Sequence, residues 1–436
     1  MPTFVLAIGL LCLLGILLSL GRRLEPALRL ERLGIPIALL VGSAALLLGP
    51  YGPWKLLPSS VTEIWVGLPA PLLTLVFATL LLGRPIPKSQ GLWKPVASQA
   101  FLSLVLGFGQ YVVGGIVVLG LLTPLLGVDP LMGCLIEIGF EGGHGAAAIM
   151  GKTFSSLGYE EGVDLGLAMA TVGLLSSTVL GSGLVVFARW KGWVVSKTSS
   201  EIGVTGADEI QLSFVELLNQ LLVNLALVGI AVFFGESILL ILRLFADYFG
   251  GLYRDVIMVF PVFPLALLGS LLTRLLLERF DKTSLVSRLL QREIGTLATD
   301  LLITTAMASI NLQLLRSDWI PLTILAITGL TWNLLAICLF SKLIFKEEWF
   351  ERSITEFGNA TGVAASGLLL LRLSDPRNIT NTLPIFSIKQ LFLQPLLSGG
   401  IVTVLAPIII TQLGLIGWTE ICGFLTLLFI GLAFLI

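Results

Sequence analysis

Charged residues are scarce in this chain, and that scarcity sets the class of protein. Only 12% of the residues are charged and 56% are hydrophobic, whereas an ordinary soluble domain has about 25% charged residues. A water-soluble chain needs more polar residues than this to cover its surface. The composition therefore excludes a soluble globular protein.

The sequence also lacks the motifs of several enzyme and binding classes. It has one histidine and four cysteines, and the cysteines show no paired spacing of the kind that binds a metal. It contains no phosphate-binding loop, no nucleophile elbow and no long basic tract. We therefore expect no ATP-driven pump, no enzyme, no resident cofactor and no nucleic-acid partner.

Long apolar runs are abundant instead. Each is continuously apolar, as expected for a helix that spans about 30 Å of hydrocarbon, and not alternating as in a barrel strand. The sequence predicts spans near residues 3–20, 34–49, 64–82, 96–126, 163–187, 214–245, 256–277, 295–311, 321–345 and 384–411, with an appended span in 412–436. The predicted fold is an all-α membrane protein with lipid as its main surroundings.

The charges of the loops alternate along the first half of the chain. Arg22, Arg84 and Lys191 mark loops that are rich in basic residues, whereas the second loop holds only Lys55. By the positive-inside rule this pattern predicts an inner-membrane protein with its N-terminus outside and its central loop in the cytoplasm. The alternation holds only if residues 129–152 enter and leave on the same face, as a re-entrant hairpin.

The second half repeats this plan upside down. It has five predicted spans and a glycine-containing segment at residues 354–371 between the last two. Residues 140–148 align without a gap with residues 357–365 and pair Gly145 with Gly362. An odd number of spans per half gives an inverted-topology repeat. The predicted layout is a first repeat at 1–190, a cytoplasmic linker at 191–213, a second repeat at 214–411 and the appended span.

Polar groups at membrane depth usually line a cavity, so the two hairpins hold the main candidate site. His144 either caps hairpin backbone or hydrogen-bonds substrate. Glu141 is either a carboxylate at the hairpin mouth or a group that holds an ammonium, a cation or a proton. Glu137 and Glu356 fit mouth or structural positions.

Further polar residues lie inside the predicted spans. Gln110 and Asn333 occupy similar depths in repeat-related spans, and either line one cavity or bond neighbouring helices. Asp300 either ligates a cation or bonds a neighbouring helix, and Arg372 either pairs with a substrate carboxylate or extends to the interface. Pro69 interrupts the third span, which predicts broken helices in the third span and in its repeat mate, the eighth.

The first hairpin and its flanks resemble a known family. The residues concerned are Leu125-Leu-Gly-Val-Asp-Pro-Leu-Met-Gly133, Gly142-Gly-His-Gly145, Gly151-Lys-Thr-Phe154 and Ala170-Thr-Val-Gly173. This stretch resembles the sodium:glutamate symporter family. The resemblance implies a homodimeric elevator transporter that imports glutamate with sodium and whose moving unit is built around the two hairpins.

The sequence departs from the family pattern at several positions. Ala146 stands where the family has threonine, Phe140 and Glu141 replace small hydroxyl residues, and Gly362 and Val363 replace proline and threonine. A carrier of another di- or hydroxycarboxylate, coupled to sodium or to protons, therefore stays an alternative, ahead of a channel or an intramembrane enzyme.

The candidate residues form two groups. The substrate- and ion-binding candidates are Glu141, Gly142, Gly143, His144, Gly145, Thr171, Asn359, Ala360, Thr361 and Gly362, and the cavity-lining candidates are Gln110, Asp300, Asn333 and Arg372. Backbone of the hairpins is expected to bind sodium, at residues that the sequence does not identify.

Overall fold

Helices joined by turns and loops make up the part of the chain that the computed structural model describes, as predicted. The described residues are 10, 12–23, 37–82, 93–194, 214–250, 254, 257, 260, 262–375, 379–394 and 396–436. Six helical stretches among them are long and apolar enough to cross a membrane. They are Trp93–Leu126, Gly162–Trp190, Val215–Ala246, Asp318–Ile344, Trp349–Ser374 and Ile401–Leu435.

The chain forms two compact units. The first comprises Met1–Ala70, Pro87–Val195 and Asp300–Ile436, and the second comprises Pro71–Ile86 and Ser196–Thr299. Each unit therefore draws on both halves of the sequence, and the candidate site lies entirely within the first.

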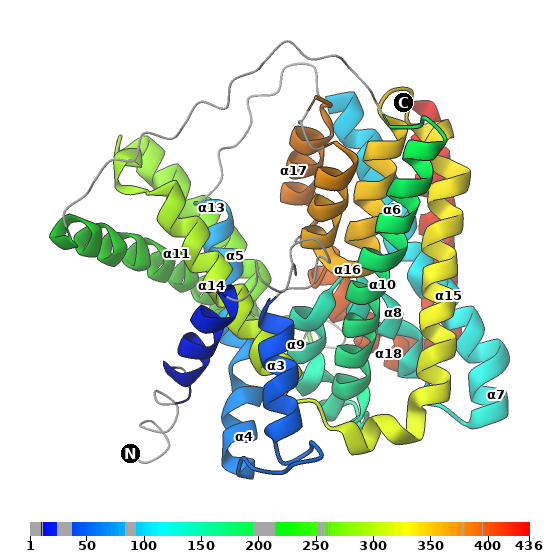
Figure 1. The fold of residues 1–436 in the computed structure, drawn as a ribbon, viewed down its shortest axis with the longest axis horizontal. Helices are drawn as coiled ribbons and strands as arrows, with labels where there is room; N and C mark the ends of the chain where they lie inside the picture. Colours follow the sequence, from blue (N-terminus) through cyan, green and yellow to red (C-terminus); the bar gives the residue numbers. More distant parts are fainter. Residues whose placement is uncertain are drawn as a thin grey trace. The chain divides into compact units, whose positions relative to one another are not determined.

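Long helices form the body of the first unit (Figure 1). They are α6 (Trp93–Val117), which continues through a π-helical turn into α7 (Thr123–Leu126), α10 (Gly162–Trp190), α15 (Leu312–Ile344), α16 (Trp349–Ser374), α17 (Thr382–Leu393) and α18 (Ile401–Leu435). Close packing depends on small residues. At Gly109 a methyl group would overlap the ring of Trp332, whose Nε1 donates to the carbonyl of Leu106 at 3.1 Å.

The first glycine-rich segment folds back on itself between α8 (Leu135–Phe140) and α9 (Gly143–Ser156). Gly166 of α10 shows this, because a methyl group there would lie 3.2 Å from Cβ of Ala147 and 3.9 Å from Cγ2 of Ile138. These two neighbours stand on opposite sides of the break at Gly142. The two arms of this hairpin thus run side by side along α10.

The second segment also folds back, within α16. A methyl group on Gly358 would lie 2.7 Å from the Cα of Gly367, a separation that an unbroken helix of nine residues does not allow. The backbone leaves the helical region at Gly362 (φ −149°, ψ 36°) and Val363 (φ 66°, ψ 172°). Trp349 to Thr361 form the first arm of α16, and the residues after Val363 form the second.

The second unit packs α11 (Phe214–Phe249) against α13 (Phe263–Arg279). A methyl group on Gly235 would lie 2.7 Å from the backbone nitrogen of Ala266, and one on Gly269 would overlap the carbonyl of Ala231. α5 (Pro69–Leu80) and α14 (Arg288–Ala308) contribute residues to both units. In the N-terminal part, the described residues 12–23 are helical, and α3 (Ile37–Leu48) and α4 (Ser59–Gly67) follow.

The predicted interruptions of spans are right in one case and wrong in another. α4 ends at Gly67 and α5 begins at Pro69, so the third span is broken as predicted. The eighth is not, since α14 continues unbroken from Arg288 to Ala308. It contains no proline, so all its backbone N–H groups remain available to the helix.

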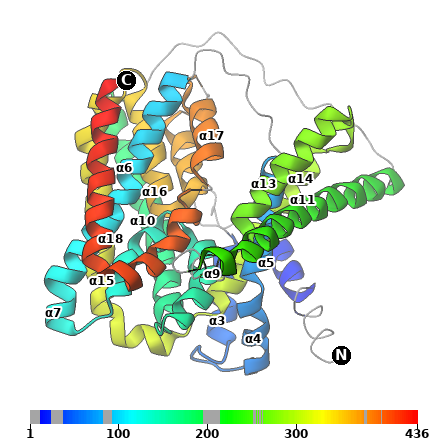
Figure 2. The ribbon, with the colours of Figure 1, turned by 180° about the vertical axis from the view of Figure 1, so that it is seen from behind.

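The end of the chain also differs from the prediction of a simple tenth span. α17 ends at Leu393 and α18 begins at Ile401, with positive φ at Ser398 (57°) and Gly399 (88°) between them. α18 then bends sharply at Gly414 (φ 75°, ψ 160°), as Figure 2 shows. The predicted border between the tenth span and the appended one, at residues 411–412, falls close to this bend. Most of the predicted linker, residues 195–213, and the start of the first span lie outside the described residues.

Candidate functional site

The tips of the two hairpins meet. A methyl group on Gly143 would overlap Cγ1 of Val363, and Asn359 donates a hydrogen bond to Glu141 across the same contact. In Figures 1 and 2, α8 and α9 approach this point from one end of the first unit, and α16 approaches it from the other. The two segments that the sequence marks as the main candidate site therefore lie in contact, and we call their contact the hairpin crossing.

Both tips have unusual backbone conformations. Gly143 has φ 69°, which glycine adopts readily. Val363 has φ 66° and ψ 172°, a region almost restricted to glycine, and such a residue stores about 1–3 kcal/mol of strain. Strain of this kind persists only where surrounding structure holds it, and it marks Val363 as part of the site.

Glu141 lies at the centre of the hairpin crossing. Its side chain is buried, with 2% of the residue exposed, so it is not a carboxylate at an open mouth. Oε1 accepts hydrogen bonds from Asn359 Nδ2 at 3.4 Å and from Ser398 Oγ at 3.1 Å. Oε2 has no hydrogen-bond partner among the described residues.

Amide side chains complete the crossing on the side of α16. Gln390 of α17 donates to Asn359 Oδ1 at 2.7 Å. Gln110 of α6 and Asn333 of α15 are hydrogen-bonded to each other at 3.2 Å, and both donate to the carbonyl of Ala360, at 2.6 and 3.1 Å. Asn333 also donates to Thr361 Oγ1 at 3.0 Å. Gln110 and Asn333 thus join α6 to α15, as the alternative of bonded neighbouring helices predicts.

Glu137 and Glu356 have structural surroundings and do not stand at a mouth. Both are fully buried. The Glu137 carboxylate accepts hydrogen bonds from Tyr111 at 2.5 Å and from Thr403 at 2.8 Å. Glu137 therefore connects α8 to α6 and α18.

A buried ion pair joins α16 to α17. Lys389 Nζ lies 2.9 Å from Glu356 Oε1, and both side chains are completely buried. Gln99 of α6 donates to the same carboxylate at 2.8 Å and accepts from Arg352 at 2.8 Å. Ser103 receives a further hydrogen bond from Lys389 at 3.2 Å. This network fixes the first arm of α16 against α6 and α17.

His144 lies beside the crossing at the start of α9 and contacts α10. Its Nε2 is 3.0 Å from Thr171 Oγ1, and the Thr171 hydroxyl donates to the carbonyl of Leu167. A Thr171 hydroxyl that donates to Leu167 requires the His144 tautomer with its proton on Nε2, which then donates to Thr171. Thr171 therefore contacts the first hairpin.

We expect Thr171→Val to lower the free energy of unfolding by about 0.5–1.5 kcal/mol, because it removes one buried hydrogen bond. His144→Ala added to the Thr171→Val background should then destabilise less than it does in the parent. Thermal unfolding of the parent, both single variants and the double variant measures this coupling. Strictly additive shifts would contradict the assigned hydrogen bond.

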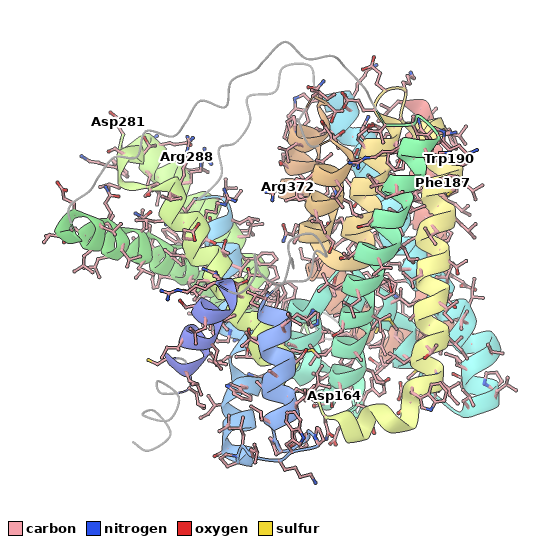
Figure 3. All side chains as sticks on the ribbon, viewed as in Figure 1. Asp164, Phe187, Trp190, Asp281, Arg288 and Arg372 are labelled. Atoms are coloured by element: carbon pink, nitrogen blue, oxygen red, sulfur yellow. The ribbon has the colours of Figure 1, made fainter. Side chains whose placement is uncertain are left out.

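Other predicted residues lie outside the crossing. Asp300 forms an ion pair with Arg22 at 2.5 Å, which favours a bond to a neighbouring helix over a cation site. Arg372 is exposed (Figure 3), as expected for a side chain that extends to the interface. Gly145 lies inside α9, beyond the break. The aligned pair Gly145 and Gly362 is therefore not the structural pair, since the first tip is at Gly143.

Sequence reasoning missed several contributors to the crossing. These are Tyr111, Lys389, Gln390, Ser398 and Thr403. Lys389 offered a signal, because it is a lone charge within the apolar run at 384–397, and such a charge normally requires a buried partner. Ser398 offered one too, because Pro395 and the run Ser398-Gly399-Gly400 interrupt the apolar sequence there, and such residues mark turns.

A family model matches most of the chain, including the first hairpin. The family model described as sodium/glutamate symporter matches residues 5–348. The chain belongs to the sodium/glutamate symporter family. The match includes the first hairpin, Gln110 and Asn333, and it ends just before α16. The second hairpin, α17 and α18 therefore lie outside the matched residues.

Other comparisons add little to this assignment. A search of the curated proteins gives no match. Among solved structures, a sodium proton antiporter from Methanocaldococcus jannaschii, MjNhaP1, is similar with a TM-score of 0.40 and 16% identity, over 98% of this chain and 100% of that chain.

Proposed function

We propose that this member of the sodium/glutamate symporter family is a secondary transporter that imports L-glutamate with sodium through the hairpin crossing. The observation that carries the proposal is the contact of two broken segments, at Gly143 and Val363, inside a chain of this family. Broken helices that meet in this way provide free backbone groups where a transporter binds its cargo.

Helix N-termini and helix C-termini both lie at the crossing, so it can bind a carboxylate substrate and a cation at the same time. α9, the second arm of α16 and α18 begin there, and helix N-termini favour anions. α8 and the first arm of α16 end there, and helix C-termini favour cations. The proposed substrate- and ion-binding residues are those predicted at the two tips, with Gln110 and Asn333 lining the site.

We assign the two folded-back segments as re-entrant hairpins of an inverted repeat. Two features support this: each segment folds back near its middle, and the repeat-related helices α6 and α15 meet at the Gln110–Asn333 hydrogen bond. The family resemblance adds a homodimer and an elevator movement. In this proposal the hairpins, α6, α10, α15 and α17 move together as the transport unit.

Aromatic and basic residues support the orientation predicted from loop charges. At the end of α10, Lys191 lies 4.6 Å from the ring of Trp190, and Lys342 lies 4.8 Å from Trp193 and 4.6 Å from Trp349. Figure 3 shows Trp190 and Phe187 at this end of the helix. Tryptophans with lysines are typical of a membrane interface, and basic residues of its cytoplasmic side. We place this end at the cytoplasmic face of the inner membrane.

Uptake of labelled L-glutamate into proteoliposomes tests the function. We expect an inward sodium gradient to accelerate uptake, and choline in its place to abolish the acceleration. Counterflow with a panel of unlabelled acids determines the substrate. The alternative, a carrier of another di- or hydroxycarboxylate, is favoured by the unmatched second hairpin. Exchange with those acids but not with glutamate would establish it, and uptake driven by protons alone would exclude sodium coupling.

A further inference from the structure

Two buried oxygen atoms at the hairpin crossing have no hydrogen-bond partner in the part of the chain that the structure describes, and both are acceptors. They are Oε2 of Glu141 and Oε1 of Gln110. Glu141 is 2% exposed and Gln110 is 0% exposed, so water in bulk does not satisfy them. Buried polar atoms without partners are rare in native proteins and indicate a missing ligand or a role in function.

The two oxygens belong to side chains that contact the same turn of α16. Glu141 accepts from Asn359, and Gln110 donates to the carbonyl of the next residue, Ala360. They also share one face of α6. Oε2 of Glu141 lies 2.9 Å from where a methyl group on Gly107 would be, and Gly107 precedes Gln110 by three residues, which places both on one side of the helix.

The charged groups around these two oxygen atoms favour a bound cation. The ammonium group of Lys389, on α17, is already bonded to Glu356 and Ser103. Glu137 adds a second carboxylate on the neighbouring turn of α8, where the side chains that bond it are the neutral hydroxyls of Tyr111 and Thr403. The first arm of α16 ends here, and a helix C-terminus attracts positive charge. A carboxylate without a compensating cation is unfavourable at such a buried position.

The space favours a small bare ion. A side chain at position 107 would collide with Oε2 and, at 2.9 Å, with Cδ1 of Leu397. Even with glycine at position 107 the space beside Oε2 is smaller than a methyl group requires, so an ammonium group with its carbon chain does not fit there. Carboxylate and amide oxygens are ligands that hard cations prefer.

We propose that Oε2 of Glu141 and Oε1 of Gln110 are two ligands of the coupling sodium ion, bound against the end of the first arm of α16. The inference rests on the proposed function and gives its ion site specific residues.

Binding of ²²Na⁺ to the purified full-length protein, without substrate and with choline as the replacement ion, tests the inference. We expect Glu141→Gln to weaken sodium affinity by about 10–100-fold and Gln110→Leu by a smaller factor, as for other changes around metal sites. Backbone carbonyls remain, so sodium dependence of uptake should persist in both variants at higher sodium concentrations. Glu141→Asp, which keeps the charge, should lie between the parent and Glu141→Gln.

Asp164→Asn is the control for loss of a carboxylate, here a partly buried one away from the crossing. Asp164 lies at the start of α10 (Figure 3) and accepts a hydrogen bond from the backbone of Asn311 at 2.7 Å. The Asp164→Asn variant should bind sodium with an affinity close to that of the parent. Size-exclusion profiles and thermal unfolding check that each variant is folded. If Glu141→Gln does not fold, the sodium affinity of Glu141→Asp tests the inference in its place.

The inference would be overturned if folded Glu141→Gln and Gln110→Leu bound sodium with the same affinity as the parent. Sodium-driven uptake by the parent would still leave the proposed function intact. If Glu141 instead holds the substrate ammonium, Glu141→Gln would bind sodium normally and lose its preference for glutamate over glutarate. This result would also overturn the inference. A parent that neither binds sodium nor responds to it would refute the proposed function itself.

Discussion

Gly143→Ala is expected to reduce sodium-driven uptake to background. The added methyl group overlaps Cγ1 of Val363, and overpacking typically costs about 1–3 kcal/mol. The φ of 69° adds about 1–2 kcal/mol for a residue with a Cβ atom. Both effects fall on the contact between the two hairpin tips, so transport should fail before membrane insertion does. Initial uptake rates and the amount of protein in the membrane measure the two effects separately.

Two further variants separate the clash from the backbone penalty. Gly158→Ala is the matched control, because Gly158 has φ 83° and nothing within 4 Å of an added methyl group. It should show only a modest loss of stability and should keep transport. Val363→Ala removes Cγ1, so it should restore part of the uptake when combined with Gly143→Ala. No recovery in the double variant would mean that the two tips do not touch during transport.

Lys389→Met is expected to lower the free energy of unfolding by about 3–5 kcal/mol, because it leaves Glu356 as an unpaired charge in the interior. The apparent melting temperature in detergent should fall strongly, and uptake should fall with it. Lys152→Met is the control for loss of a lysine, since Lys152 is exposed.

Removing both charges should be much less harmful than removing one. Glu356→Gln combined with Lys389→Met keeps an acceptor for Gln99 Nε2 and leaves no unpaired ion. We expect the double variant to regain more than half of the lost melting temperature. A double variant as unstable as Lys389→Met alone would show that the pair has a role beyond mutual neutralisation.

The site could be predicted where chemistry is local to a segment. Glycines around His144 indicated the first break, and the lone polar residues Gln110 and Asn333 indicated a shared cavity or interface, which the hydrogen bond of 3.2 Å between them bears out. The break in the second segment was harder to predict. The alignment pairs Gly143 with Ala360, whereas the backbone breaks at Gly362 and Val363. A valine at positive φ has no local signature, because only its neighbours in space hold it there.

By itself the sequence determined that this is a helical membrane protein of the sodium/glutamate symporter type with two glycine-rich segments. Apolar length and scarcity of charge are properties of the chain that any fold must satisfy in lipid. Only the tertiary structure decided which residues stand at the crossing and which charges are paired. Lys389 meets Glu356, Ser398 meets Glu141 and Thr403 meets Glu137 because helices distant in sequence pack together. Such contacts depend on the three-dimensional path of the backbone, and no spacing along the chain encodes them.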